Sequence, residues 1–383
     1  MGKRGNGEGS ISKYKDGRWC GRYTIHTANG PKRKVVYGKS RAEAAAKLAK
    51  AMADRDGGLI FDSGNITVGE HLDQWLKNCV KHSVKQTTYE NYEYVVRRHL
   101  VPAIGAKRLG KLSPAQVQSL YRQKLDAGLA PRTVRLIHTV LHRALKQAVR
   151  WGLVPRNVTD AVEVPRPQKK EIRPLTPEQV KTLLRAAEGD RLEALYVLAV
   201  TTGMREGELL GLRWEDVDLE QEVVRVRQQL TRTRSGLSFT KPKNGKGRSV
   251  ALMGTAAKAL RAHRDAQDRE RSRLAGLWQE TGLVFTSATG TPLDVGNLTY
   301  RSFRPLLERA GLPRVRVHDL RHSFATLFLS NGTHPKIVQE MLGHSNISMT
   351  MDTYSHVLPN MQGEAVRAMD PFFGAEERKD ADV

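Results

Sequence analysis

Acidic side chains are scarce in this chain of 383 residues, which carries 63 lysines and arginines but only 40 aspartates and glutamates. The formal net charge is +23 and the isoelectric point is close to 10.1. So basic a protein is unusual among ordinary soluble enzymes. Its charge favours a polyanionic partner, which is most often nucleic acid and less often an anionic membrane.

Long apolar runs are missing as well. No stretch approaches the ~18 apolar residues that span a bilayer, and Met1 to Ser10 lacks the apolar segment of a signal peptide. We therefore expect no membrane association and a cytoplasmic, nucleoid-associated protein. The chain has only two cysteines, Cys20 and Cys79, and they do not have metal-ligand spacing. We interpret both as reduced structural residues.

The excess positive charge is concentrated in the first part of the chain. It amounts to +8 for residues 1–62, +12 for residues 63–170 and only +3 for residues 171–383. Solubility alone rarely requires such a one-sided excess. The pattern predicts an N-terminal part that clamps a polyanion, followed by a folded enzyme with local basic sites.

Residues 1–62 contain short β-prone runs separated by the turn signals "KDG" and "ANG", followed by an alanine-rich segment. Ser40 and Glu43 have capping-box spacing and predict a helix from Arg41 to about Asp54. We expect a small three-stranded sheet with one helix. The candidate DNA-binding residues of this unit are Lys15, Arg18, Arg22, Lys32, Arg33 and Lys34.

Helical periodicity begins at Thr67 and continues to residue 163. It predicts a basic four-helix module, in which the second helix runs from Thr87 to about Leu100 and ends before Pro102. The fourth helix opens at Pro131 and stops at Gly152. Residues 164–174 contain three prolines and a charge cluster and are typical of an inter-domain linker.

Residues 175–383 are mostly helical, except for β-prone segments between Val223 and Val250. We interpret "RSG" and "KNGKG" there as hairpin turns of a small antiparallel sheet. The whole chain is thus predicted to be mainly α with a small antiparallel β component, in three domains at 1–62, 63–163 and 175–383.

The segment "VHDLRHSF" holds His318 and His322 with an acid between them, close to the H-E-x-x-H zinc signature. Asp319 stands where that signature has glutamate, and only His344 offers a third ligand. We therefore expect neither a metal nor a cofactor.

Two arginines are better candidates for chemistry. His318 and Arg321 are three residues apart and so share a helical face, where the guanidinium is suited to phosphate oxygens. In "TTGMREGELLGLRW", Arg205 stands at the start of a predicted helix, and Glu208 is placed to orient its guanidinium. Taken alone, the H-x-x-R spacing of His318 and Arg321 occurs by chance in many helical proteins. Arg205 alone fits a surface charge paired with Glu208 or Glu206 better than a catalytic residue.

In order, the motifs "TTGMREGELLGLRW", "TKPKNGKGRSVAL", "HDLRHSFAT" and "LGHSNISMTMDTYSH" resemble the boxes of the tyrosine recombinases, the phage integrase family. The resemblance covers roughly Leu175 to Pro359. Upstream, the four-helix module resembles that family's core-site-binding domain, and residues 1–62 resemble the arm-site-binding domain of mobile-element integrases.

The resemblance implies site-specific cutting and rejoining of double-stranded DNA through a 3′-phosphotyrosyl intermediate, to integrate or excise a mobile element. Tyr354 would be the nucleophile, and Arg205 and Arg321 would neutralise the phosphoryl oxygens. His318 would assist the tyrosine's proton, and His344 would hydrogen-bond a non-bridging oxygen. The resemblance also implies a homotetramer on core and arm sites, with a host DNA-bending protein and an excisionase as further partners.

A lysine of the hairpin would protonate the leaving 5′-oxygen. In that family the lysine usually stands about eight residues before a proline, and Ala251 occupies the proline's position here. The resemblance therefore implies Lys243, while Lys241 stays possible if the turn is one residue pair longer. We expect Lys241 and Lys246 to contact phosphates. The alternatives are a type IB topoisomerase, against which the tandem binding modules argue, and a non-catalytic DNA-binding protein, against which the complete set of motifs argues.

Overall fold

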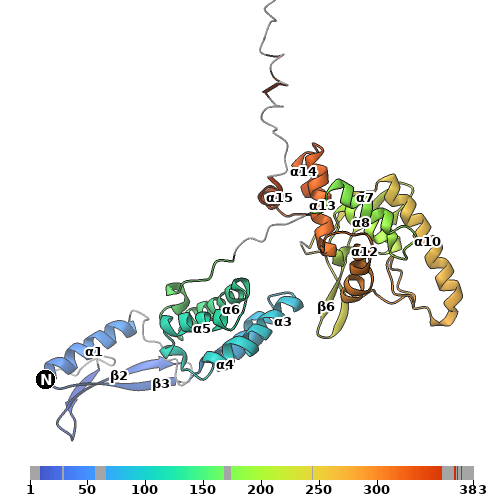
Figure 1. The fold of residues 1–383 in the computed structure, drawn as a ribbon. Coiled ribbons are helices and arrows are strands. Elements are labelled where there is room, and N and C mark those ends of the chain that lie inside the picture. The colour runs from blue at the N-terminus through green and yellow to red at the C-terminus, as the bar shows by residue number, and fades with distance from the viewer. Residues whose placement is uncertain are drawn as a thin grey trace, which may run out of the picture. The chain divides into compact units, whose positions relative to one another are not determined.

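The structure is a computed structural model that describes residues 9–27, 30–56, 66–167, 174–243, 245–355, 366, 367, 369 and 372. The chain divides into two compact units, residues 1–169 and 170–383 (Figure 1). Within the described residues, no helix is long and apolar enough to cross a membrane. The prediction of a mainly helical chain with small antiparallel sheets is confirmed.

The N-terminal unit begins with an antiparallel sheet in the order β1 (Ser10–Lys13), β2 (Trp19–Thr27) and β3 (Gly30–Gly38). Helix α1 (Arg41–Asp56) follows, and Ser40 caps it by accepting the Glu43 N–H at 3.1 Å. The glycines explain how closely helix and sheet approach. A Cβ on Gly38 would lie 2.5 Å from the Ala44 nitrogen, and one on Gly21 would lie 3.0 Å from the Leu48 Cβ.

The helical module of the same unit has its own apolar core, in which Trp75 stacks on Tyr92. Capping boxes at Thr67 and Ser113 start two of its helices. Its α-helices are α2 (Val68–Trp75), α3 (Gln86–Val95), α4 (Val101–Ile104), α5 (Pro114–Asp126) and α6 (Pro131–Arg150).

The predicted end of the second helix before Pro102 is wrong. Helical structure continues from α3 through a π-helical segment, Val96–Leu100, into α4, where Pro102 stands in the first turn. The wider π turn changes which carbonyl each N–H faces, and a proline in a first turn lacks only a donor that would have no partner there.

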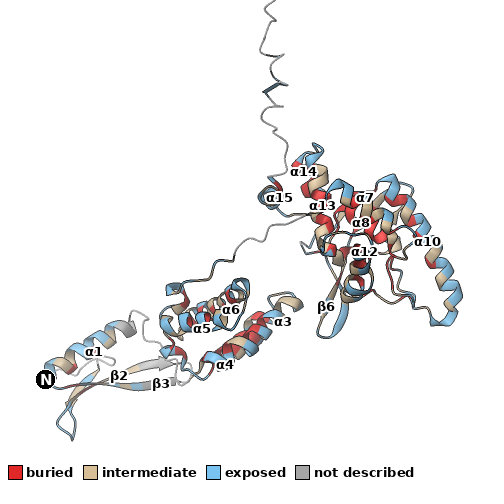
Figure 2. Ribbon diagram, in the orientation of Figure 1, coloured by how far each residue is buried: buried red, intermediate tan, exposed pale blue. Residues whose placement is uncertain are grey.

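The C-terminal unit is built around α8 (Glu193–Thr202), where every residue from Ala194 to Thr202 is buried (Figure 2). A helix that is apolar all round belongs inside a core, and α10 and α13 pack on it. The other α-helices are α7 (Pro177–Ala186), α9 (Glu206–Leu210), α10 (Gly254–Leu274), α11 (Val295–Asn297), α12 (Arg304–Arg309), α13 (Val317–Ser330), α14 (Pro335–Leu342) and α15 (Ile347–Tyr354).

The β-strands of this unit form two sheets. One has the order β4 (Val217–Asp218), β5 (Val223–Val226) and β8 (Arg248–Ala251), and the other pairs β6 (Gln229–Thr233) with β7 (Gly236–Thr240). "RSG" is the β6–β7 turn, as predicted. "KNGKG" is not a hairpin turn, because β8 pairs with β5 instead of β7.

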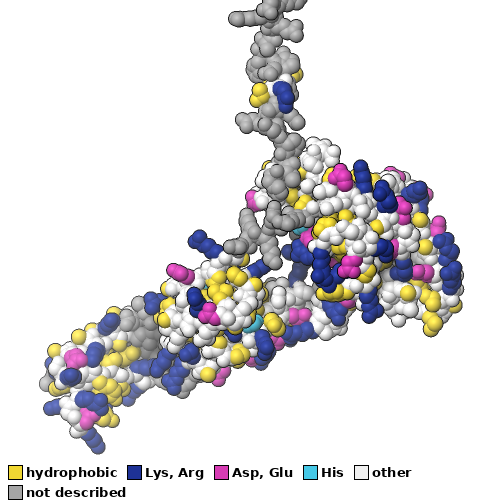
Figure 3. Space-filling view, in the orientation of Figure 1, with side chains coloured by type: hydrophobic (Ala, Val, Ile, Leu, Met, Phe, Trp, Pro, Cys, Tyr) yellow, Lys and Arg dark blue, Asp and Glu magenta, His cyan; other side chains and the backbone are white. Residues whose placement is uncertain are grey.

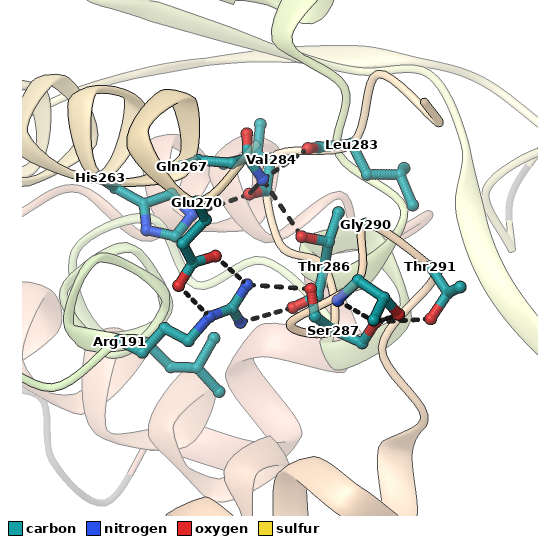
Figure 4. A network of polar contacts seen from close by, with 12 residues as sticks. Arg191, His263, Gln267, Glu270, Leu283, Val284, Thr286, Ser287, Gly290 and Thr291 are labelled. Atoms are coloured by element: carbon teal, nitrogen blue, oxygen red, sulfur yellow. Dashed lines mark hydrogen bonds and ion pairs between the residues drawn. The ribbon is translucent and has the colours of Figure 1, made fainter. Parts of the chain in front are cut away.

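A polar network holds the start of α8 against α10 (Figure 4). Arg191 binds both Glu270 carboxylate oxygens at 2.7 Å and also donates to the carbonyls of Thr286 and Ser287. Gln267 donates to the Val284 carbonyl at 3.0 Å. These bonds satisfy backbone carbonyls of the irregular segment 284–287. They also fix the N-terminal end of α8, whose C-terminal end lies at the candidate site.

Candidate active site and DNA-binding surfaces

Two glycines in the left-handed backbone conformation hold Arg205 and Arg321, the two arginines of the site. Helix α8 ends at Gly203, with φ 61°, and α14 ends at Gly343, with φ 64°. The Gly203 carbonyl accepts Nη1 of Arg321 at 2.7 Å, and the Gly343 carbonyl accepts Nη2 of Arg205 at 3.2 Å. Each guanidinium is therefore held by the backbone of a different sequence motif.

Glu208 is fully buried and is bound by two arginines, Arg205 and Arg248. It accepts Nη1 of Arg205 at 2.8 Å and the backbone N–H of the same residue at 2.9 Å. Arg248 of β8 binds both carboxylate oxygens, at 2.7 and 3.1 Å. Burial opposes ionisation of Glu208, but Arg248 and then Arg205 overcome it and lower the pKa of Glu208 to about 2.

Arg321 carries a buried positive charge with an unused donor. Its side chain is 4% exposed, and Nη2 has no hydrogen-bond partner among the described residues. Burial, followed by the charge of Arg205, lowers the pKa of Arg321 to about 9, so the guanidinium is still charged at neutral pH. A buried donor without a partner is costly, and an anion bound beside Arg205 would remove that cost.

Tyr354, the last residue of α15, is 3% exposed. Its hydroxyl is hydrogen-bonded to Nδ1 of His322 at 2.6 Å. We expected His318 to assist the tyrosine's proton, but the contact comes from the histidine one helical turn further along α13. Burial raises the pKa of Tyr354 to about 12, although Arg321 acts in the opposite direction.

His318 and His344 are both half-buried. Burial, aided by neighbouring positive charges, lowers the pKa of each to about 4, so both imidazoles are neutral at neutral pH. Nδ1 of His344 is hydrogen-bonded to the Thr350 hydroxyl at 2.9 Å, which fixes the ring. Among the described residues, no group of three or more His, Cys, Asp or Glu side chains could hold a metal ion.

A cavity of about 550 Å³ opens beside the arginines. Arg205, Arg248, Lys246 and His344 contribute cationic or imidazole side chains to its wall, and Glu340 contributes an acidic one. Lys241 and Lys243 are exposed in the segment that joins β7 to β8. The structure thus brings Arg205, Arg321, Glu208 and Arg248 together, with His322 and Tyr354 beside Arg321.

The N-terminal sheet has one face that α1 does not cover. Arg22 and Arg33 lie on it, opposite the face of Gly21, because side chains alternate along a strand. Arg18 stacks over the ring of Tyr37 on the same face. Lys34 lies on the helix side, Lys15 lies in the exposed turn before β2, and the side chain of Lys32 is outside the described residues.

Helix α6 presents a basic stripe in the helical module. Its exposed cations are spaced three, four or eight residues apart, and the helix contains no acidic residue. Lysines and arginines recur along the surface of the N-terminal unit in Figure 3. The α6 basic stripe consists of Arg132, Arg135, Arg143, Lys146 and Arg150.

Comparison with known proteins identifies the chain. Residues 173–361 match the phage integrase family, and residues 67–125 match its N-terminal SAM-like domain. A tyrosine recombinase XerC-like protein of Caldanaerobacter subterraneus subsp. tengcongensis is 31% identical over 362 residues, which cover 89% of this chain and 92% of that protein. The chain belongs to the phage integrase family. It is a tyrosine recombinase, which cuts and rejoins DNA strands at specific sites.

Other relatives of this recombinase agree in length and fold. An integrase of Streptomyces ambofaciens is 31% identical over 390 residues, covering 97% of this chain and 98% of that one. The Tn1549 transposon integrase, solved in complex with transposon right end DNA, has a TM-score of 0.67 at 22% identity and covers 80% of this chain and 100% of its own. Lambda integrase, solved as a tetramer bound to a Holliday junction, has a TM-score of 0.60 at 20% identity, with coverage of 92% and 96%.

Reasoning from the sequence of this recombinase missed two residues, Arg248 and His322. Arg248 begins β8, directly after the lysines of the segment that joins β7 to β8, and its position opposite Glu208 depends on strand pairing. From the sequence, His322 is a candidate only as a metal ligand. Its sequence signal was its place directly after Arg321, on the same helical face as His318.

Proposed function

We propose that this recombinase integrates or excises a mobile DNA element by forming a 3′-phosphotyrosyl bond through Tyr354. The observation that supports this most directly is the buried Nη2 of Arg321, which has no partner among the described residues. A phosphoryl oxygen of DNA would supply the missing acceptor. Tyr354 is close enough to Arg321 for the guanidinium charge to oppose the rise in the phenol's pKa that burial causes.

Arg205 and Arg321 then act on the charge that builds up on the phosphoryl oxygens. Fixed donors aimed at a developing charge stabilise a transition state without reorganisation. Glu208 holds the Arg205 guanidinium in place and is itself kept ionised by Arg248. His318 and His344, neutral at neutral pH, each offer one N–H donor, and the bond from Thr350 to Nδ1 of His344 leaves Nε2 as the nitrogen for a non-bridging oxygen.

Lys243 supplies the proton for the leaving 5′-oxygen in this proposal. A lysine suits that role because the segment between β7 and β8 is exposed and the ammonium group is at the end of a long flexible stem. Lys246, which lines the cavity beside the arginines, and Lys241 hold the neighbouring phosphates.

DNA is held by two basic surfaces in addition to the active site. The α6 basic stripe binds core-site phosphates. The N-terminal unit binds arm sites through Arg22 and Arg33 of the uncovered sheet face, and through Lys15, Arg18, Lys32 and Lys34. Four copies assemble on paired sites, with a host DNA-bending protein and an excisionase as further partners.

The test is covalent trapping on a nicked core-site suicide substrate, in which the cleaved strand diffuses away. Wild type should give a protein–DNA adduct that survives denaturation, and Tyr354→Phe should bind the DNA but give none. Tyr196→Phe removes another buried hydroxyl of the same unit, one bonded to Ser302, and should still form the adduct. An adduct in Tyr354→Phe would overturn the proposal.

A further inference from the structure

The contact between His322 and Tyr354 joins α13 and α15, which carry two separate sequence motifs. The Tyr354 hydroxyl lies 2.6 Å from Nδ1 of His322, and the two ring centroids are 5.8 Å apart. This is within the distance over which a base takes a proton directly. Within the described part of the chain, His322 is the one side chain with a hydrogen bond to that hydroxyl.

His318, by contrast, lies one turn earlier on the same helix. Its ring meets the His322 ring edge to face, with centroids 5.5 Å apart. The helix thus places His322 between His318 and the nucleophile. The hydrogen bond to the tyrosine therefore comes from His322.

Both partners are in the protonation state that proton transfer requires. Burial lowers the pKa of His322, with Asp319 raising it and Arg321 and Arg316 lowering it, so the imidazole is neutral near pH 7. Burial keeps the Tyr354 phenol protonated. His344, whose own pKa is lowered in part by His322, adds no negative charge. The phenol therefore donates to a neutral Nδ1.

We propose that His322 is the catalytic base for Tyr354, a step that rests on the proposed function of Tyr354 as the nucleophile. The Tyr354 oxygen forms a bond to phosphorus as the bond from phosphorus to the 5′-oxygen breaks. The phenol proton passes to Nδ1 of His322, and the 5′-oxygen leaves as a hydroxyl with the proton of Lys243. In rejoining, the 5′-hydroxyl attacks and gives its proton to the lysine, while His322 returns its proton to the tyrosine.

The experiment measures single-turnover cleavage of the suicide substrate by full-length His322→Ala. Loss of a general base should slow cleavage by about 10²–10⁴-fold, with core-site binding in a gel-shift assay unchanged. The wild-type rate should be flat from about pH 7 to 9. The variant must wait for spontaneous ionisation of a phenol with a pKa of about 10 or higher, so its rate should rise about tenfold per pH unit. Added imidazole should restore part of the rate.

His322→Asn separates proton transfer from positioning, because the amide oxygen can accept the tyrosine's hydrogen bond but takes no proton at neutral pH. It should stay as slow as His322→Ala, and it carries the test if the alanine variant fails to fold. A wild-type rate in His322→Asn would mean that the contact only positions the tyrosine, and it would overturn the proposal.

A substrate with a 5′-bridging phosphorothiolate gives an independent check. Its sulfur leaves without a proton, so it should not rescue His322→Ala. Rescue would place the defect at the leaving group and refute the assignment. A flat pH profile in His322→Ala together with a rising one in His318→Ala would return the role to His318. If Tyr354→Phe abolishes the adduct while His322→Ala cleaves normally, only the His322 assignment fails.

Discussion

Replacing Arg248 by methionine would remove a charge from the centre of the site while keeping most of the side chain's bulk. Glu208 would then lose the partner that binds both of its oxygens and keep only Arg205. The fall in the Glu208 pKa from its ordinary 4.5 to about 2 corresponds to about 3 kcal/mol of stability. Because Arg248 is the largest cause of that fall, the variant should lose most of it.

Hydrogen exchange followed by mass spectrometry measures this loss locally. Amides of α9 and β8 should exchange roughly 100-fold faster in Arg248→Met at pH 7, since about 1.4 kcal/mol corresponds to a factor of ten. The control is Arg271→Met, which breaks a pair with Glu280 whose side chains are 56% and 58% exposed. Such surface pairs contribute about 1 kcal/mol or less, so its exchange should change little.

The pH dependence has a definite sign. The folded state lowers the Glu208 pKa, so this stabilisation is complete above the unfolded value of 4.5 and is lost as the pH falls through about 2. The difference between wild type and Arg248→Met should therefore be constant from pH 7 to about 5 and shrink below that. Equal exchange in the two proteins at pH 7, or a difference that grows toward pH 3, would refute the reasoning.

Three further predictions concern the lysine, the N-terminal sheet and a glycine. Lys243→Ala should slow cleavage by about 10²–10⁴-fold, and a 5′-bridging phosphorothiolate should restore much of the rate; rescue of Lys241→Ala instead would move the role there. Deleting residues 1–62 should abolish arm-repeat binding in fluorescence anisotropy but spare core-site cleavage, and loss of core cleavage alone would contradict this. Gly203→Ala should lower the melting temperature measured by calorimetry, because its Cβ would lie 2.3 Å from Phe324 at a φ of +61°; an unchanged melting temperature would contradict that clash.

Features that depend on local sequence could be predicted. The Ser40 cap of α1 forms as its spacing with Glu43 indicates, because it needs only a side chain and an N–H three residues apart. The contact of Arg205 with Glu208 has the same origin, since residues three apart face one another on a helix. The ordered motifs are also local in sequence and predict the family.

Features that depend on packing between distant segments could not be predicted. His318 and His322 share one face of α13, and only the docking of α15 decides which of them meets Tyr354. Likewise, β8 leaves β7 and pairs with β5, which brings Arg248 to Glu208 across 40 positions of sequence. No periodicity or spacing in the sequence predicts how α15 docks or which strand β8 pairs with.

The support of the two arginines by glycine carbonyls has a consequence for mutagenesis. Replacing a side chain by alanine leaves every peptide carbonyl in the chain, so a scan of this kind would pass over the acceptors at Gly203 and Gly343. Those two contacts are encoded by backbone conformation, and only a change that moves the backbone can remove them. Substitutions of side chains near the arginines should therefore be tolerated more readily than replacement of Gly203 or Gly343 by any other residue.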